Sequence, residues 1–333
     1  MRTRPTLTWE PSGDLPPATT DLAPVVEAVR AGGVVVLSGA GLSTESGIPD
    51  YRGEHGSLRR HTPMTYQEFT GSEQARQRYW ARSQLGWRAM IRARPNAGHV
   101  AVAELAEAGL VTGVITQNVD GLQQAAGAPE VIELHGSLSR VLCLHCRAFT
   151  TRAEVDRRLR EANPHFEAEA ERHRTARVNP DGDVELPEEA VRDFRVVPCA
   201  ACGVGVLKPD VVFFGENVPP DRVAACRGLV AGAGSLLVLG SSLTVMSGLR
   251  FVRQAADAGT PVLIVNNQPT RGDRWGVRVQ LPLGETLRDV VAAVREQPGG
   301  RSRLSARSEA DRATPGPSAG RRDTGRPGPT ATS

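Results

Sequence analysis

Four of the five cysteines form two Cys-x-x-Cys pairs, Cys143 with Cys146 and Cys199 with Cys202. Each pair can bind one edge of a tetrahedron through a backbone turn, and this spacing is a strong signal of a zinc site. Four thiolates fill the coordination sphere of zinc and leave no position for water or substrate. We therefore expect one structural zinc ion with these four cysteines as its ligands.

A glycine-rich loop follows the first apolar run, Val34–Leu37, and reads Ser-Gly-Ala-Gly-Leu-Ser. Glycines directly after a strand let the backbone approach a pyrophosphate at a helix N-terminus, where free N–H groups favour anions. A full dinucleotide fingerprint would have a further glycine three positions after Gly41, where Thr44 stands instead. A hydride-transferring dehydrogenase therefore fits poorly. On this loop alone, a nucleotide site and a tight turn without ligand both remain open.

Polar side chains follow two later apolar runs, at the points where strands would end. Gln117, Asn118 and Asp120 come directly after one run, and His135 comes after the next. Ligands of open α/β sheets bind at the carboxyl edge of the strands. An imidazole, with an ordinary pKa of about 6.5, suits general-base catalysis near neutral pH. From these residues alone, a structural histidine and an Asx-capped loop stay open as alternatives.

Short apolar runs alternate with helical segments along most of the chain. Nearly continuous apolar strands between helices predict an α/β fold with a Rossmann-like, mostly parallel sheet covered on both faces. The expected strands are Val34–Leu37, Val111–Thr116, Val131–Leu134, Val211–Phe214, Leu236–Leu239, Val262–Val265 and Val277–Leu281. The expected helices include Leu22–Ala31, Glu73–Arg92, Gly98–Ala108 and Thr286–Val294.

Two regions interrupt this alternation. A charged, Arg- and Glu-rich stretch separates the two cysteine pairs, and the last residues contain almost nothing apolar to bury. We therefore expect a small zinc-binding domain inserted into a larger one, with the ligand cleft between them. The expected parts are a loose N-terminal segment (1–20), a Rossmann-like nucleotide-binding domain (21–142 and 206–297), the zinc-binding insert (143–205) and a disordered tail (298–333).

The composition is that of an ordinary enzyme: 333 residues, 40% of them hydrophobic, with a net charge of +3. No apolar run approaches the roughly 20 residues of a membrane span, and no signal-peptide core is present near the N-terminus. Cysteines at metal-binding spacing suit a reducing compartment. We therefore expect a cytoplasmic enzyme without a membrane partner. A zinc ribbon alone would suggest a nucleic-acid-binding module, but the nucleotide-site residues outweigh it, so nucleic acid is not the expected partner.

Six segments resemble motifs of the sirtuin family, occur in that family's order and lie within a resemblance that covers residues 20–295. They are Gly39–Arg52, Thr116–Leu122, Glu133–Gly136, Lys208–Glu216, Gly240–Leu243 and Val265–Asn267. Further segments are similar to the class II branch, which includes a mitochondrial sirtuin: Pro49–Arg52, Arg78–Arg82, Arg140–Leu144 and Asp181–Asp183. The chain is therefore identified as a class II type sirtuin, and we expect a bacterial one.

The resemblance implies NAD-dependent removal of acetyl or other acyl groups from lysines of proteins or peptides. The products would be nicotinamide, O-acyl-ADP-ribose and free lysine, with NAD as co-substrate. His135 is then the catalytic base, and Asn118 and Asp120 contribute to the chemistry at the nicotinamide ribose. Two alternatives stay open: a protein mono-ADP-ribosyltransferase, and a non-catalytic sensor that binds NAD or ADP-ribose.

The resemblance also implies which residues bind the two substrates. Those expected to hold NAD are Gly39, Ala40, Gly41, Ser43, Asp50, Tyr51, Arg52, Gln117, Asn118, Asp120, Gly240, Ser241, Ser242, Asn266, Asn267, Gln268 and Leu283. Those expected to border the peptide groove are Val212, Phe213, Phe214, Gly215 and Glu216. An acyl-lysine peptide would pair against this segment as an added strand, which tolerates many peptide sequences.

Tyr79 and Arg82 lie three residues apart in the expected helix Glu73–Arg92 and so share one helical face. A guanidinium can bind a carboxylate through two parallel hydrogen bonds. A sirtuin branch that removes acidic acyl groups uses such a Tyr-x-x-Arg pair in a comparable region. One interpretation therefore places this pair in the acyl pocket, and the other is an exposed arginine beside a buried tyrosine.

Overall fold

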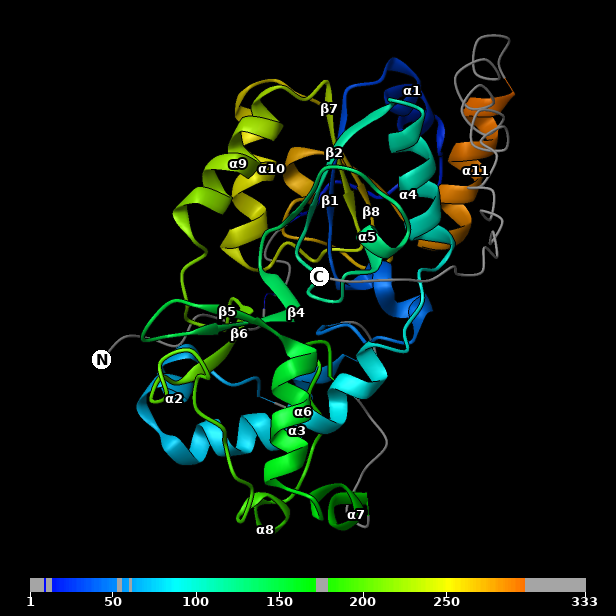
Figure 1. Ribbon diagram of the computed structural model, residues 1–333. Helices are drawn as coiled ribbons and strands as arrows, with labels where there is room; N and C mark the ends of the chain where they lie inside the picture. The colour runs from blue at the N-terminus through cyan, green and yellow to red at the C-terminus, as the bar shows by residue number, and fades with distance from the viewer. Residues whose placement is uncertain (1–8, 10–13, 53–55, 60–61, 172–178, 297–333) are drawn as a thin grey trace, which may run out of the picture.

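The computed structural model describes residues 9, 14–52, 56–59, 62–171 and 179–296. Most of the segment predicted to be loose (1–20) and the tail predicted to be disordered (298–333) therefore lie outside the described residues. Two units are visible, each built on its own sheet (Figure 1). The described helices include none that is long and apolar enough to cross a membrane.

The larger unit contains a six-stranded sheet, and all of its pairings are parallel. In spatial order the strands are β3 (Val131–Glu133), β2 (Val111–Thr116), β1 (Val34–Ser38), β7 (Ser235–Leu239), β8 (Val262–Val265) and β9 (Val277–Val279). The strand order reverses direction between β1 and β7, and in open α/β sheets ligands bind at the carboxyl edge beside such a reversal. Six predicted strands are confirmed, with ends that differ by at most two residues.

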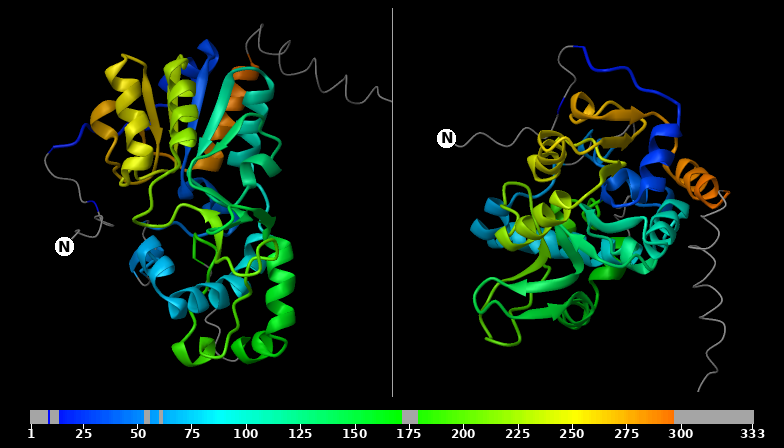
Figure 2. Two further views of the ribbon diagram at one scale, coloured as in Figure 1. Left: turned by 60° about the vertical axis from the view of Figure 1, so that its left-hand side comes forward. Right: turned by 90° about the horizontal axis from the view of Figure 1, so that it is seen from above.

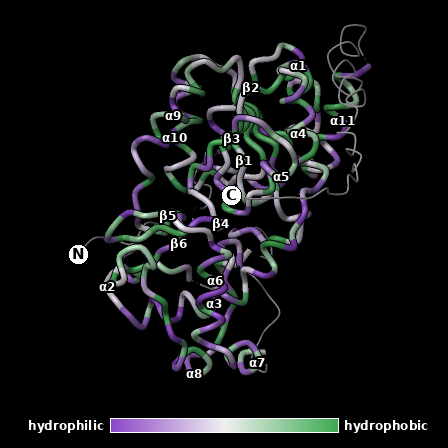
Figure 3. Tube along the Cα trace, in the orientation of Figure 1, coloured by the Kyte–Doolittle hydropathy of each residue, from purple (hydrophilic) through white to green (hydrophobic). Residues whose placement is uncertain are grey.

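Helices cover both faces of this sheet (Figure 2). One face carries α1 (Ala23–Ala31), α4 (Ala97–Glu107) and α11 (Leu283–Arg295), and the other carries α9 (Pro220–Ala231) and α10 (Met246–Asp257). Alternate residues of β1 serve the two layers: Val36 packs in the first core and Val35 in the second. β1 is therefore buried on both faces, which explains its continuous apolar run. Hydrophobic residues are concentrated along these central strands (Figure 3).

The smaller unit contains a three-stranded antiparallel sheet of β5 (Phe149–Thr151), β4 (Gly136–Cys143) and β6 (Leu207–Val211). Its helices are α2 (Tyr66–Gly71), α3 (Glu73–Met90), α6 (Arg152–Ala162), α7 (Phe166–Glu171) and α8 (Glu188–Val191). Its core combines Trp80 of α3 with Val141 of β4 and Leu159 of α6. Residues before 143 thus share a core with the zinc-binding segment, whose proposed boundaries at 143 and 205 stay a prediction.

One predicted strand is wrong. The apolar run Val211–Phe214 was expected to form a strand, but β6 ends at Val211 and belongs to the small sheet. Its other residues include buried Lys208 and Asp210, which are held in ion pairs. Charged residues at buried positions interrupt the apolar pattern of β6. The prediction therefore missed Leu207–Val211 and chose the apolar run that follows it.

Four short elements complete the fold near the site. They are the 3-10 turns η1 (Ala40–Ser46), η2 (Ser57–Arg59) and η3 (Asp273–Trp275), and the helix α5 (Leu122–Ala125). η1 follows β1 directly, so the glycine loop is the entry to a helical turn. α5 follows the polar residues at the end of β2.

Candidate active site and zinc centre

A cavity of about 910 Å³ lies at the carboxyl ends of β1, β2 and β7, and both units contribute to its wall. It brings together His135, Asn118 and Asp120, every residue predicted to hold NAD, and the whole segment Val212–Glu216. These residues come from loops that are far apart in the sequence. Their convergence follows from the parallel sheet, whose strands all end at the same edge.

The glycines of the loop after β1 are required by a close approach to the loop after β7. A Cβ on Gly41 would lie 2.9 Å from the Cα of Gly240, and one on Gly39 would lie 2.7 Å from the Cβ of Ser241. Gly240 itself has a φ of +61°, which side chains rarely adopt. The two loops therefore form one tightly packed floor that exposes backbone to the cavity.

Ser43 is the centre of a hydrogen-bonded group at this floor. Its hydroxyl donates to Asp120 Oδ2 at 2.7 Å and accepts from Asn118 Nδ2 at 3.0 Å. His99 Nε2 lies 3.4 Å from the same oxygen, and its Nδ1 accepts from the backbone N–H of Asn96. The proton of His99 is therefore on Nε2, directed at Ser43. Burial lowers the pKa of His99 to about 4, and burial raises the pKa of Asp120.

His135 lies in the two-residue connection between β3 of the large sheet and β4 of the small one. Its Nδ1 is 3.0 Å from the carbonyl oxygen of Gln117, and its Nε2 is 2.8 Å from the hydroxyl of Ser247. A carbonyl oxygen only accepts, so Nδ1 carries the proton and Nε2 offers a lone pair. Burial lowers the pKa of His135 to about 4, so the ring is neutral at pH 7 and able to act as a base.

Gln117, which follows β2, is hydrogen-bonded to the ends of β1 and β7. Its side-chain Nε2 donates to Ser241 Oγ at 2.9 Å and to the carbonyl of Ser38 at 3.2 Å. Asn118 Nδ2 also donates to the carbonyl of Gly39, at 3.1 Å. The loops after β1, β2 and β7 are therefore fixed relative to one another before any ligand binds.

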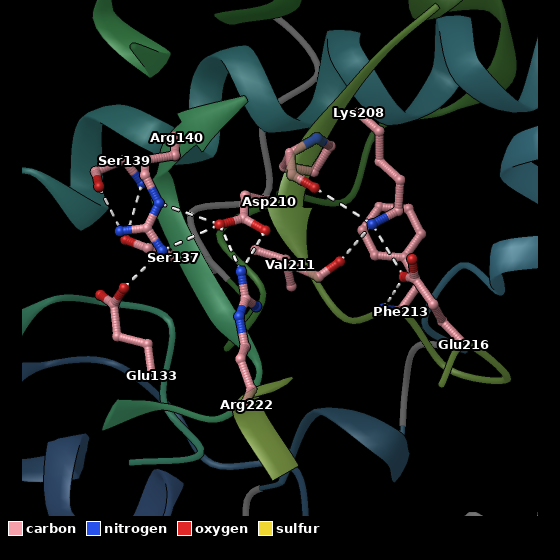
Figure 4. Close-up of polar contacts among 11 residues, drawn as sticks. Glu133, Ser137, Ser139, Arg140, Lys208, Asp210, Val211, Phe213, Glu216 and Arg222 are labelled. Atoms are coloured by element: carbon pink, nitrogen blue, oxygen red, sulfur yellow. Dashed lines mark hydrogen bonds and ion pairs between the residues drawn. The ribbon is translucent and has the colours of Figure 1, made fainter. Parts of the chain in front are cut away.

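Lys208, the only lysine of the chain, holds the segment Val212–Glu216 in place at the cavity wall (Figure 4). Lys208 Nζ lies 2.9 Å from Glu216 Oε2, donates to the carbonyl of Val211 at 2.5 Å, and stands 4.5 Å from the ring centroid of Phe213. Glu216 also accepts from the backbone N–H of Phe213 at 2.8 Å. Burial lowers the pKa of Lys208, and the Glu216 carboxylate opposes that shift.

A second charged group, which we call the junction cluster, joins the two units (Figure 4). It consists of Glu133, Arg140, Asp210 and Arg222. Arg140 lies 2.7 Å from Glu133 and 3.0 Å from Asp210, and Arg222 lies 2.8 Å from Asp210. These residues belong to β3, β4, β6 and α9 in that order, so the cluster links the strand before His135 to the strand after it. Two positive and two negative groups balance one another.

The remaining residues predicted to hold NAD lie on the cavity wall. The Tyr51 ring packs edge-on against Phe214 at 5.9 Å, and burial raises the pKa of Tyr51 and lowers that of Arg52. Asn266 Nδ2 donates to the carbonyl of Gln268 at 2.6 Å. Leu283 begins α11, where the N–H of the following residue donates to a carboxylate from η1.

The structure does not bring Tyr79 and Arg82 to this cavity; neither is among the described residues that line it. Tyr79 is buried against Phe69 and Phe213, with ring centroids 5.4 and 5.2 Å away, and burial raises its pKa. Arg82 donates to the carbonyl of Leu186 at 2.9 Å. The buried tyrosine matches the structural alternative, but Arg82 is half-buried and not exposed as that alternative expected. An acyl-pocket role for the pair stays a prediction.

The four predicted zinc ligands meet at one end of the small sheet. Their Sγ atoms all lie within 4.8 Å of one another, with 3.9 Å between Cys143 and Cys202 and 3.8 Å between Cys146 and Cys199. A tetrahedron with Zn–S bonds of about 2.3 Å has edges of about 3.8 Å. The residue after each pair has a left-handed backbone, with φ of 64° and 76°, so the two turns are alike. The geometry fits zinc.

Two residues of the site carried no motif that would have identified them. His99 was predicted only as part of a helix, and the one local signal was Asn96 three residues before it, which forms a capping box with it. Ser247 is in the first turn of α10 and lines the cavity. Its role depends on a contact with His135, 112 positions away, that the sequence pattern does not show.

The chain is similar to known proteins of one family. Residues 39–247 match the model of the Sir2 family. An NAD-dependent protein deacetylase of Streptomyces coelicolor is 70% identical over 292 residues, which cover 87% of this chain and 96% of the relative. A solved Sir2 structure with a deacetylated p53 peptide and 3'-O-acetyl ADP-ribose is 29% identical, with a TM-score of 0.66, and covers 84% of this chain and 98% of that one.

A second solved Sir2 structure, with a p53 peptide and NAD+, is 30% identical with a TM-score of 0.63. It covers 82% of this chain and 98% of that one. The family match spans more than half of the chain and includes the glycine loop, the residues after β2, His135 and the peptide segment. The chain belongs to the Sir2 family, the sirtuins.

Proposed function

We propose that this protein removes acetyl or other acyl groups from lysines of proteins in a reaction that consumes NAD. The products are nicotinamide, O-acyl-ADP-ribose and the free lysine. The observation that carries the proposal is the single cavity, which unites a neutral histidine base, the glycine floor and the peptide segment. The similarity to NAD-dependent deacetylases and to Sir2 structures with peptide and NAD supports it.

The cavity divides into two substrate regions under this proposal. NAD lies over the floor made by the loops after β1, β7 and β8, where packed glycines let phosphates approach the backbone. Asn118 and Asp120, held by Ser43, face the nicotinamide ribose. The acyl-lysine peptide pairs as a strand beside Val212–Glu216, which Lys208 holds in place.

His135 acts after nicotinamide has left. The acyl carbonyl oxygen attacks the anomeric carbon of the ribose and displaces nicotinamide. Nε2 of His135 then takes the proton of a ribose hydroxyl, whose oxygen closes onto the acyl carbon. The bond between the acyl carbon and the lysine nitrogen breaks as the amine leaves with a proton, and a water molecule adds to the acyl carbon to give O-acyl-ADP-ribose. With a pKa of about 4, this imidazole is unprotonated throughout the neutral range and needs no prior proton loss.

The four cysteines would hold zinc outside this chemistry. Four thiolates complete its coordination, so the metal would stabilise the small unit and not bind substrate. The cytoplasmic location and the absence of nucleic-acid and membrane partners stay predictions from the sequence.

The test is product analysis with acyl-lysine peptides. The purified protein, NAD and an acetyl-lysine peptide are expected to yield free-lysine peptide and O-acyl-ADP-ribose, detected by mass spectrometry. Changing His135 to alanine removes the base and should slow product formation by about 10²- to 10⁴-fold, with the fold retained in circular dichroism. Protein-bound ADP-ribose without free lysine would instead identify a mono-ADP-ribosyltransferase, and binding without turnover would identify a sensor.

A further inference from the structure

Ser247 contacts Nε2 of His135, the nitrogen that would act as the base. It lies in the first turn of α10, is half-buried, and lines the same cavity as the histidine. Its Oγ is 2.8 Å from His135 Nε2. We propose that the Ser247 hydroxyl is a positioning residue for His135, which orients the ring before proton transfer and accepts its Nε2–H afterwards. The proposal rests on the function proposed above.

The direction of the hydrogen bond follows from the opposite edge of the ring. Gln117 offers a carbonyl oxygen to Nδ1, so Nδ1 must carry the proton and Nε2 must accept. The Ser247 hydroxyl is therefore the donor in the free enzyme. Because the torsion that turns an imidazole is broad, a ring held at one edge alone can swing. Ser247 supplies the second point of attachment.

The two attachments belong to one rigid assembly. A Cβ on Gly248 would lie 2.6 Å from Oε1 of Gln117, so the first turn of α10 packs directly on the residue whose carbonyl holds Nδ1. Gln117 is itself bound to Ser241 and to the carbonyl of Ser38. Ser247 and the Gln117 carbonyl therefore keep a fixed spacing, and the imidazole lies between them.

A hydroxyl suits both protonation states of the base. In the neutral ring it donates to the Nε2 lone pair, and it rotates aside when the ribose hydroxyl takes that lone pair. Once the proton has moved from the ribose oxygen to Nε2, the same serine oxygen accepts the new N–H, since a hydroxyl is one donor and two acceptors. The imidazolium formed in the step then has a partner at each nitrogen.

The experiment uses the full chain with NAD and an acetyl-lysine peptide, in wild type and in Ser247→Ala, Ser247→Thr and Ser247→Val. Threonine and valine have the same shape and differ in the hydroxyl. Two rates are compared: formation of free-lysine peptide, and exchange of labelled nicotinamide into NAD. The exchange reports the step before the base acts, because nicotinamide leaves before proton transfer.

We expect Ser247→Ala and Ser247→Val to lower the deacylation rate about 3- to 10-fold more than the exchange rate. This is the effect of losing one hydrogen bond. Threonine should stay within about twofold of wild type for both reactions. Deacylation by alanine or valine at or above the wild-type rate, or equal losses in both reactions, would overturn the proposal. Thermal unfolding of each variant shows whether a loss of activity comes from misfolding. Where it does, the comparison of the threonine and valine variants, which differ only in the hydroxyl, decides whether the hydroxyl is required. A wild-type protein that forms no free lysine would refute the proposed function instead.

Discussion

His99 and His135 show how burial sets the state of single residues at this site. Both rings are bonded at Nδ1 and Nε2 by groups of the fold, and burial lowers the pKa of each to about 4. His99 contacts the Ser43 hydroxyl, which is hydrogen-bonded to Asn118 and Asp120, while Nε2 of His135 keeps a lone pair. The same physical effect thus acts on a residue that holds the site together and on the residue proposed as the base.

This burial predicts how stability depends on pH. The unfolded chain takes up protons near the ordinary histidine pKa of 6.5, whereas the folded chain resists protonation of His99 and His135 until about pH 4. The free energy of unfolding therefore has its full value above pH 6.5 and decreases as the pH drops toward 4. For His99, which is 1% exposed, the slope is at most about 1.4 kcal/mol per pH unit.

Urea titrations at about pH 7, 6 and 5 measure this slope. His99→Gln should make the slope shallower, whereas His165→Gln, at an exposed position, should leave it unchanged. A stability that stays constant over this window in the wild type would mean that both histidines titrate normally in the folded protein.

Arg82 carries the prediction about the acyl group. If it lies in the acyl pocket, Arg82→Met should weaken turnover of a glutaryl-lysine peptide by about 1.5–3 kcal/mol and leave acetyl-lysine turnover unchanged. The bond to the Leu186 carbonyl favours a different result, an equal and small change for both peptides. The ratio of kcat/KM for the two peptides measures the difference. A selective loss on the glutaryl peptide would place Arg82 in the pocket during catalysis.

At the scale of elements, the central strands β1, β7 and β8 were predictable because each is a continuous, almost wholly apolar run buried on both faces. β6 was not, because Lys208 and Asp210 interrupt its apolar character. Their charges are tolerated only because Glu216, Arg140 and Arg222 arrive from other elements. The local sequence pattern does not show these partners, so the bounds of β6 were predicted wrongly.

The candidate site divides in the same way. The residues of the cavity floor follow strand ends, and their motifs identify them from the sequence. Ser247 and His99 contact side chains of distant segments, and the only local signal is the capping box that Asn96 forms with His99. Tyr79 and Arg82 show the converse, since their helical spacing is as predicted but their face packs into the small unit. Spacing along a helix sets which residues share a face and not what that face contacts.

The junction cluster predicts coupling between elements. Asp210→Asn removes the carboxylate shared by Arg140 and Arg222 and leaves Arg222, which is 20% exposed, without its ion pair to Asp210. We expect the free energy of unfolding to fall by about 1.5–3 kcal/mol, the usual value for hydrogen bonds to charged groups. Deacylation should fall as well, because the strands on both sides of His135 lose their link.

The matched control is Glu161→Ala, which removes an exposed ion pair with Arg157 on α6. Exposed pairs contribute little, so this variant should lose less stability than Asp210→Asn and keep its activity. In a double variant with Arg222→Met, the losses should be smaller than the sum of the single losses. Additive losses would show that the two residues act independently.

At the scale of the whole molecule, the histidine proposed as the catalytic base lies where the chain passes from one unit to the other. β3 pairs in the large sheet, β4 pairs with β6 in the small sheet, and His135 lies between them. The segment Val212–Glu216, proposed to bind the peptide, follows β6, and the chain then returns to the large unit at α9. In the proposed reaction both substrates would therefore meet at a junction whose geometry depends on how firmly β4 and β6 are held together.

Zinc would hold that pair of strands. Cys143 ends β4, and Cys199 and Cys202 lie in the turn that leads into β6. Cys199→Ala leaves three thiolates, which do not complete the tetrahedral site. We expect zinc content, measured by mass spectrometry, to fall from about one ion per chain, and the thermal midpoint to fall with it. The KM for the peptide should rise, because the strand before the peptide segment loosens.

Cys226→Ala is the matched control, since Cys226 is buried in the large unit and lies outside the four-cysteine group. It should cost some packing energy but keep the zinc. The proposed role of the metal would fail if the Cys199 variant, freed of zinc, unfolded at the wild-type temperature and kept the wild-type KM. In that case the backbone pairing of β4 with β6 would be enough to hold the junction, and the metal would stabilise only the turns that bind it.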